Sequence, residues 1–172
     1  MKLLDLVSRR LAAGNAPHAL IGAAALAIHG IARSTYDVDL LTTDRGVLEP
    51  VFWDPLRADG ASIDARRGDH DDPLAGVVRV SAAGARPVDV IVGKWRWQAR
   101  AVERAERLPD GPLVVAARDL VALKLYAGGT QDLWDVQALL ALPDASVLIA
   151  AVDDDLADLP LDVRARWAQL RP

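Results

Sequence analysis

Apolar residues near the start of the chain follow two different periods, and their order predicts alternating helices and strands. Leucine and valine recur every three or four positions in residues 3–11, which predicts an amphipathic helix that ends at Gly14. Residues 17–21 are a short apolar run that stops at Gly22, as in a buried strand followed by a tight turn. The alanine-rich residues 23–28 then favour a helix, because alanine has the highest helix propensity.

A second strand is predicted at residues 36–41, where polar and apolar residues alternate. Val38 and Leu40 share one face of this strand, so Asp37 and Asp39 project together from the other face. The sequence therefore places two carboxylates close to each other, soon after a glycine turn and a short helix.

The rest of the chain predicts a hairpin followed by helices. Residues 76–81 and 87–92 are apolar strands joined by the turn-prone residues 82–84, and we expect them to pair. A helix at residues 47–56 and a strand at residues 62–66 have weaker patterns. Further helices are expected at residues 95–108, 117–127, 131–142 and 161–170. This order predicts an α/β fold.

Length and composition predict one ordinary globular domain spanning residues 1–172, with a sheet-containing core at 17–93 and a helical part at 94–172. Cysteine is absent, which excludes disulfides, thiol catalysis and cysteine-ligated metal sites. Residues 1–11 do not have the pattern of a signal peptide, and no apolar run approaches the roughly 20 residues of a membrane span. We therefore expect a cytoplasmic protein with no membrane contact.

A third carboxylate changes the interpretation of the first two. An isolated pair such as Asp37 and Asp39 is most simply explained by a strand end in water, or by hydrogen bonds from a neighbouring turn. Asp89, however, lies within the apolar strand at residues 87–92, where a buried carboxylate is costly unless a positive charge meets it. A metal ion is the simplest such partner, and oxygen ligands on adjacent strands suit Mg²⁺.

These residues also carry a resemblance to a known family. Ile21-Gly22-Ala23, then Arg33-Ser34-Thr35-Tyr36-Asp37-Val38-Asp39, and later Val88-Asp89-Val90 resemble the nucleotidyltransferase superfamily of DNA polymerase beta. More narrowly, they are similar to the bacterial minimal nucleotidyltransferases that include abortive-infection toxins of type IV toxin and antitoxin systems. The helical residues 119–125 and 131–135 resemble the family's segment with a lysine and paired aspartates.

The resemblance implies a fold and an activity. The fold is the nucleotidyltransferase fold, with a mixed central sheet flanked by helices and additional C-terminal helices. The activity is transfer of a nucleoside monophosphate from a Mg²⁺-bound nucleoside triphosphate to a hydroxyl acceptor, such as RNA, tRNA or protein, with two Mg²⁺ ions taking part. The catalytic and metal-binding residues implied are Asp37, Asp39 and Asp89. The nucleotide-binding residues implied are Gly22, Ala23, Arg33, Thr35 and Lys124.

One departure from the family pattern leaves a second function open. The family usually has Gly-Gly or Gly-Ser at the turn, whereas this chain has Gly22-Ala23. Alanine still offers its backbone N–H to a phosphate, but it has no hydroxyl and approaches less closely than glycine. The alternative is a catalytically inert nucleotidyltransferase-fold module that binds or regulates, such as a toxin-antitoxin component. Retention of all three carboxylates opposes that alternative.

Each cation near the site also has a purely structural explanation. Arg33 either binds the triphosphate or pairs with Asp37 or solvent, and Thr35 is either a site residue or an ordinary strand residue. Lys124 rises from a mostly apolar helix face, so its ammonium needs a phosphate or a site aspartate nearby, unless it simply snorkels to solvent. Asp132 is best explained by the dipole of its helix, and Asp135 is left unassigned.

A stripe of arginines follows the strand that carries Asp89. Its members recur at helical spacing, and they are Arg96, Arg100, Arg104 and Arg107. A solvated charged helix is the default interpretation. The alternative is an RNA surface near Arg96, Arg100 and Arg104, although a net charge of −4 argues against tight non-specific binding of nucleic acid. A cognate antitoxin or the product of a neighbouring gene is the other partner that the resemblance implies.

Overall fold

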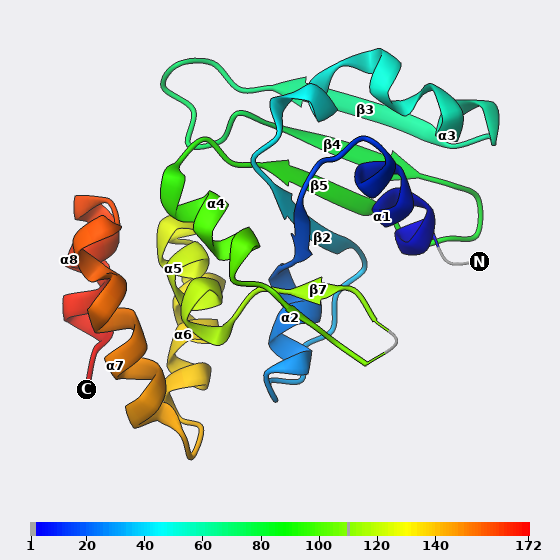
Figure 1. The fold of residues 1–172 in the computed structure, drawn as a ribbon. Coiled ribbons are helices and arrows are strands. Elements are labelled where there is room, and N and C mark those ends of the chain that lie inside the picture. The colour runs from blue at the N-terminus through cyan, green and yellow to red at the C-terminus, as the bar shows by residue number, and fades with distance from the viewer. Residues whose placement is uncertain (1–2, 110) are drawn as a thin grey trace.

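The computed structural model describes residues 3–109 and 111–172, and its centre is a seven-stranded mixed sheet (Figure 1). The strands are β1 (His18–Leu20), β2 (Val38–Thr42), β3 (Ser62–Arg67), β4 (Gly76–Ser81), β5 (Val88–Val92), β6 (Glu106–Arg107) and β7 (Leu113–Val114). Their order across the sheet is β3-β4-β5-β2-β1-β7-β6. Strands β2 and β5 are parallel, as are β1 and β7, and the other neighbours are antiparallel. The predicted α/β fold with a mixed sheet is confirmed.

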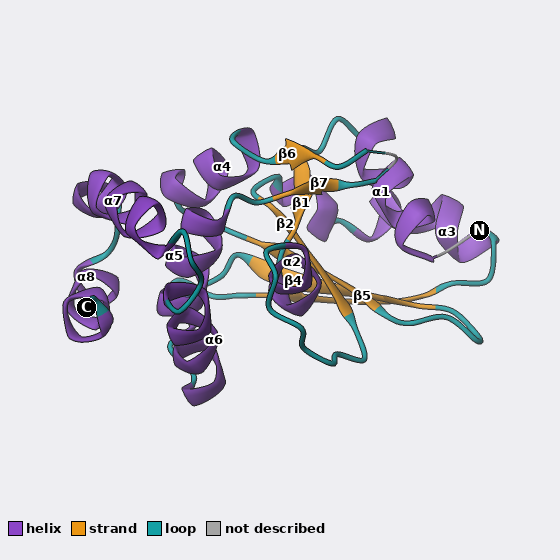
Figure 2. Cartoon of the chain, turned by 90° about the horizontal axis from the view of Figure 1, so that it is seen from below, coloured by secondary structure: helices purple, strands orange, loops and turns teal. Residues whose placement is uncertain are grey.

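Helices lie against both ends of this sheet. The α-helices are α1 (Leu3–Ala13), α2 (Gly22–Ile28), α3 (Asp54–Ala58), α4 (Arg96–Glu103), α5 (Ala117–Ala127), α6 (Thr130–Leu140), α7 (Ala145–Asp155) and α8 (Leu161–Leu170). Figure 2 shows α1 and α3 together on one side of the sheet, with α7 and α8 outside α5 at the opposite end. Helices α1 and α8 therefore lie on opposite sides of the molecule (Figures 1 and 2). Among the described residues, no helix has both the length and the apolar character needed to cross a membrane.

The core explains why the apolar strands pair as they do. Strand β4 buries every second residue, including Val78 and Val80, and leaves Arg79 between them exposed. Strand β5 likewise buries Val88 and Val90. Because side chains alternate across a strand, the residues between these valines share the opposite face of the sheet. That face carries the charged residues of the candidate site.

The structure differs from the sequence prediction in several segments. The helix predicted at residues 47–56 is two 3₁₀ turns, η1 (Arg45–Leu48) and η2 (Pro50–Trp53), followed by the short helix α3. Pro50 has no N–H for a continuous helix, so it begins a new turn instead. The helix predicted at residues 95–108 ends at Glu103, because the chain then pairs with β7 as β6. Helix α7 and the 3₁₀ turn η3 (Leu156–Asp158) were not predicted.

Candidate active site

The three predicted carboxylates lie close together at the N-terminal end of the parallel strands β2 and β5. Parallel pairing places Asp39 directly opposite Asp89. Asp37 lies just before the first residue of β2, so it is not the strand residue that the sequence pattern predicted. The side chain of Asp89 is 15% exposed and that of Asp37 is 33% exposed. The structure therefore brings the three together, and their roles stay predictions.

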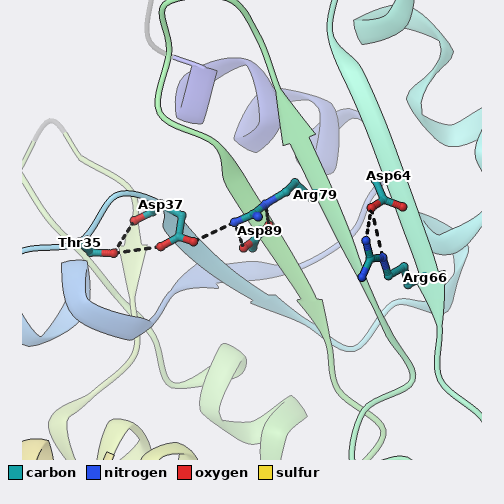
Figure 3. Close-up of polar contacts among 6 residues, drawn as sticks. All are labelled: Thr35, Asp37, Asp64, Arg66, Arg79 and Asp89. Atoms are coloured by element: carbon teal, nitrogen blue, oxygen red, sulfur yellow. Dashed lines mark hydrogen bonds and ion pairs between the residues drawn. The ribbon is translucent and has the colours of Figure 1, made fainter. Parts of the chain in front are cut away.

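An arginine that the sequence analysis missed lies between two of these carboxylates. Arg79 Nε donates to Asp89 Oδ1 at 2.9 Å, and Arg79 Nη2 donates to Asp89 Oδ2 at 2.9 Å and to Asp37 Oδ2 at 2.8 Å. Figure 3 shows the guanidinium pointing toward Asp37 and Asp89 and away from Asp64, which pairs with Arg66. The positive partner that the apolar-strand aspartate requires is therefore present in the chain itself.

The hairpin contains a signal that would have found Arg79. Strands β4 and β5 pair with Arg79 opposite Asp89 and Val80 opposite Val88, which makes the hairpin symmetric about Gly84. Gly84 has a φ of +68°, a left-handed conformation that favours glycine at a turn. Pairing residues outward from Gly84 in the sequence would have placed the arginine beside the aspartate.

Asp39 differs from its two neighbours because its carboxylate has no partner. It makes no hydrogen bond or ion pair with residues 3–109 and 111–172. Burial, and then the charges of Asp37 and Asp89, raise the pKa of the Asp39 carboxyl to about 6, against smaller opposing effects of Lys124 and Arg79. This carboxylate therefore carries a negative charge that the chain leaves uncompensated at neutral pH.

The glycine turn is fitted to Asp39. Gly22 has a φ of +63°, and a Cβ at this position would lie 2.9 Å from Asp39 Cγ, with the carboxylate oxygen still closer. Glycine is therefore required both by the backbone conformation and by the close approach. Gly22 begins helix α2, whose N-cap residue Ile21 provides no side-chain hydrogen bond. The first N–H groups of this helix, including that of Ala23, have no intrahelical acceptor.

Lys124 lies on the helical side of the site, in a cavity of about 380 Å³ that Gly22 also lines. The Lys124 side chain is 10% exposed, and its ammonium lies 2.7 Å from Asp132 Oδ1 and 2.8 Å from Asp135 Oδ2. Arg33 also pairs with Asp135. The predicted helix-dipole explanation of Asp132 is therefore incomplete, since this residue pairs with Lys124. Asp135, left unassigned from the sequence, holds both cations.

Thr35 supports a carboxylate. Its hydroxyl lies 3.0 Å from Asp37 Oδ1 and 3.1 Å from the Asp37 carbonyl oxygen (Figure 3). Because Arg79 takes the other carboxylate oxygen, both oxygens of Asp37 have a donor. The structure thus gives Thr35 the position of a residue that orients Asp37.

The arginine stripe does not have the predicted form. Arg104 caps the end of α4 and Arg107 lies in β6, so the four arginines do not share one helix. Arg100 pairs with Asp158 at 2.8 Å. Arg104 pairs with Asp155 at 2.8 Å and also with Asp119. Carboxylates of later segments therefore pair with Arg100 and Arg104, and an RNA surface at these arginines stays a prediction.

Of the three carboxylates at this end of the β2–β5 pair, only that of Asp39 has no hydrogen-bond donor among the described residues. Within residues 3–109 and 111–172, no group of three His, Cys, Asp or Glu side chains forms a ready metal cluster. The guanidinium of Arg79 fills the space between Asp37 and Asp89. The uncompensated oxygens of Asp39, beside those of Asp37, are the hard donors that Mg²⁺ prefers.

Comparison with known proteins finds solved structures of similar fold. No protein-family model matches the chain, and no curated protein matches it by sequence. The solution structure of the antibiotic-resistance factor ANT(2'')-Ia matches with a TM-score of 0.53 and 16% identity, over 90% of this chain and 91% of that one. The crystal structure of ANT(2'')-Ia in complex with adenylyl-2''-tobramycin matches with a TM-score of 0.53 and 14% identity, over 88% and 95%.

ANT(2'') is an aminoglycoside nucleotidyltransferase, and similarity at this level of identity concerns the fold. A nucleotidyltransferase-like protein from Paracoccidioides brasiliensis matches with a TM-score of 0.47 and 15% identity, over 93% of this chain and 89% of that one. The narrower resemblance to toxins stays a prediction. The chain has the nucleotidyltransferase fold.

Proposed function

We propose that this chain is a divalent-metal-dependent nucleotidyltransferase, which moves a nucleoside monophosphate from a nucleoside triphosphate to an acceptor hydroxyl. The observation that carries the proposal is the position of Asp39. This uncompensated carboxylate lies opposite Asp89 in the sheet, two residues after Asp37, and against the Gly22 turn. A protein tolerates such a charge at neutral pH when a cation neutralises it during function.

The proposed roles follow from the positions of the side chains. Asp39 and Asp37 would hold Mg²⁺, which supplies charge neutralisation and orientation of the triphosphate. The free N–H groups at Gly22 and Ala23 would donate hydrogen bonds to phosphate oxygens. Lys124 has three N–H donors, of which two are directed to Asp132 and Asp135, so one remains for a phosphate in the shared cavity.

The transfer forms one bond and breaks one. The acceptor oxygen bonds to the α-phosphorus, the bond from that phosphorus to the bridging oxygen breaks, and pyrophosphate leaves with the electron pair. The hydroxyl proton passes to the carboxylate of Asp89, which borders a hollow of about 400 Å³ where an acceptor has room. Arg33 adds positive charge near the triphosphate from its place beside Asp135.

The identity of the acceptor and of any protein partner is a more specific part of the proposal. The predicted RNA surface has lost Arg100 and Arg104 to internal ion pairs, which leaves Arg96 with no ion pair among the described residues. An RNA acceptor and a cognate antitoxin therefore remain predictions from the family resemblance. A second Mg²⁺ ion bound by Asp89 also remains a prediction. Arg79 bonds both oxygens of that carboxylate, where the second ion would bind.

The test is incubation with each α-labelled nucleoside triphosphate and Mg²⁺, together with total RNA, a protein mixture or a panel of small hydroxylated compounds. The expected result is label transferred to one acceptor class by wild type. The control is Asp54→Asn, an exposed aspartate of α3 paired with Arg57, which should transfer as wild type does. Triphosphate binding without transfer to any acceptor would instead support the inert module that Ala23 leaves open.

A further inference from the structure

Arg79 bridges Asp37 and Asp89 with its guanidinium, as a metal ion bound to both carboxylates would do. Two of its N–H groups meet the two oxygens of Asp89, and Nη2 also reaches Asp37. Thr35 takes the remaining oxygen of Asp37. Between Asp37 and Asp89, all four carboxylate oxygens therefore have a donor from the chain.

Asp39 shows the opposite condition, although it lies directly beside Asp89 in the sheet. Its carboxylate receives no hydrogen bond from any described residue, and it approaches the backbone of Gly22. The charge of Arg79 therefore offsets two carboxylates and leaves the third for an external cation. Arg79 holds Asp89 through both oxygens but Asp37 through only one, so Asp37 keeps lone pairs that can join Asp39 at a cation.

We propose that Arg79 takes the place of a second metal ion, so that this site binds one divalent cation, at Asp39 with Asp37, while Arg79 holds Asp89. The inference rests on the proposed nucleotidyl transfer, whose site it describes. It departs from the two-ion expectation that the family resemblance implies.

Chemistry makes Arg79 a permanent occupant. A guanidinium stays charged at any physiological pH. Its planar fork matches the two oxygens of a carboxylate, which a lysine cannot do. A hydrated Mg²⁺ would have to lose water and break three hydrogen bonds to enter between Asp37 and Asp89.

The fold also fixes Arg79 in place. Its neighbours Val78 and Val80 are fully buried, so the strand cannot slide without exposing them. Asp64 lies opposite Arg79 on the other side, but Asp64 pairs with Arg66 at 2.9 Å. Arg79 is thus a positioning residue, which orients the Asp89 carboxylate toward the hollow that both residues line.

The experiment counts bound Mn²⁺ by electron paramagnetic resonance, with and without a non-hydrolysable triphosphate analogue. Wild type should bind one ion per chain at the site. Arg79→Met and Arg79→Gln should bind two, and their first ion should bind about tenfold more tightly, because one nearby positive charge is gone. Arg79→Lys loses the planar fork but keeps the positive charge that repels a second cation, so it should stay at one ion. The control Arg66→Met, on the same sheet face and 81% exposed, should match wild type.

Four results separate this inference from the proposed function. One ion in wild type and two in either folded variant supports it, and circular dichroism shows which variants are folded. Two ions in wild type overturn it while leaving the proposed function intact. One ion in wild type and in every folded Arg79 variant also overturns it, since the arginine then excludes nothing. No ion and no triphosphate bound by wild type overturns the proposed function, and with it this inference.

Discussion

Two clusters in this molecule have the same composition at their centre, an arginine between two aspartates, yet they differ in what surrounds them. At the candidate site, Arg79 bridges Asp37 and Asp89. Among the helices, Arg104 bridges Asp119 and Asp155 and ties α4 to α5 and to the end of α7. The first cluster has a third, uncompensated carboxylate beside it, and the second has another cation instead, since Arg118 lies 3.8 Å from Asp155.

Depth separates the clusters further. The Asp119 side chain is 3% exposed, and burial raises the pKa of its carboxyl while the hydrogen bond from Arg104 opposes that rise. Arg79 lies at the surface, and it borders a hollow large enough for a small molecule. A balanced cluster between helices holds elements together, whereas an excess of negative charge beside a hollow is suited to binding a cation. The two clusters contain the same residue types, so their net charge and their access to solvent distinguish the candidate binding site from the structural cluster.

The largest expected effect is the loss of transfer in Asp39→Asn. Removing the uncompensated carboxylate removes the main cation ligand at nearly constant volume, so transfer should fall by about 1,000-fold. The apo variant should unfold at a higher temperature than wild type at pH 7. It lacks the buried negative charge of Asp39, which Asp37 and Asp89 repel. Labelled-nucleotide transfer and thermal denaturation measure the two effects. Full activity in this variant would place the site elsewhere.

The helix cluster should show the reverse pattern. Arg104→Met leaves Asp119 buried without its partner, so the free energy of unfolding should fall by about 3 kcal/mol. Arg100→Met breaks only a pair with the exposed Asp158, so it should cost under about 1 kcal/mol. Urea denaturation measures both. In either variant, the protein that remains folded should bind triphosphate as wild type does, and weakened binding would show that the cluster reaches the site.

The pH dependence of apo stability offers a smaller effect. The pKa of Asp39 is raised to about 6 in the folded chain from an ordinary value of 3.8, so its proton stabilises the fold at low pH. This stabilisation is complete below about pH 4 and is lost as the pH rises through 6. Wild type should therefore lose about 2 kcal/mol more than Asp39→Asn over that range, allowing for partial exposure. Urea denaturation at a series of pH values measures this loss. If the free energy of unfolding changes with pH equally in the two proteins, the pKa of Asp39 is not raised in the folded chain.

Local patterns are sufficient to predict the α/β class and to single out the carboxylates, whereas the nucleotidyltransferase fold is predicted from the family resemblance. The strand at residues 87–92 and the hairpin were predicted from alternation and a turn, because register in a short hairpin depends on neighbouring residues. Asp39 and Asp89 could be paired only through the family resemblance, since parallel strands far apart in sequence bring them together. The two-residue strands β6 and β7 have no pattern of their own and exist because β7 pairs with β1.

The partners of the site cations could not be predicted for a related reason. Arg33 and Asp135 lie on different elements, and only the packing of α6 brings them into contact. Lys124 is expected to meet a phosphate or a site aspartate; its ion-pair partners lie in the next helix, and its charge also acts on Asp39. Helical periodicity gives the face of a side chain, but the partner across that face is fixed by how the helices pack.

The smallest effect tests whether Lys124 belongs with the site or with the structural clusters. Two aspartates already neutralise its charge, so Lys124→Ala should weaken triphosphate binding by only about tenfold. Asp132→Asn provides the matched comparison, because it removes one of these anions and leaves the lysine freer to meet a phosphate. Its triphosphate affinity, measured by calorimetry with Mg²⁺, should rise a few-fold. If both variants bind as wild type does, Lys124 acts only to join α5 to α6, in the manner of Arg104, and the cavity that it shares with Gly22 does not hold the triphosphate.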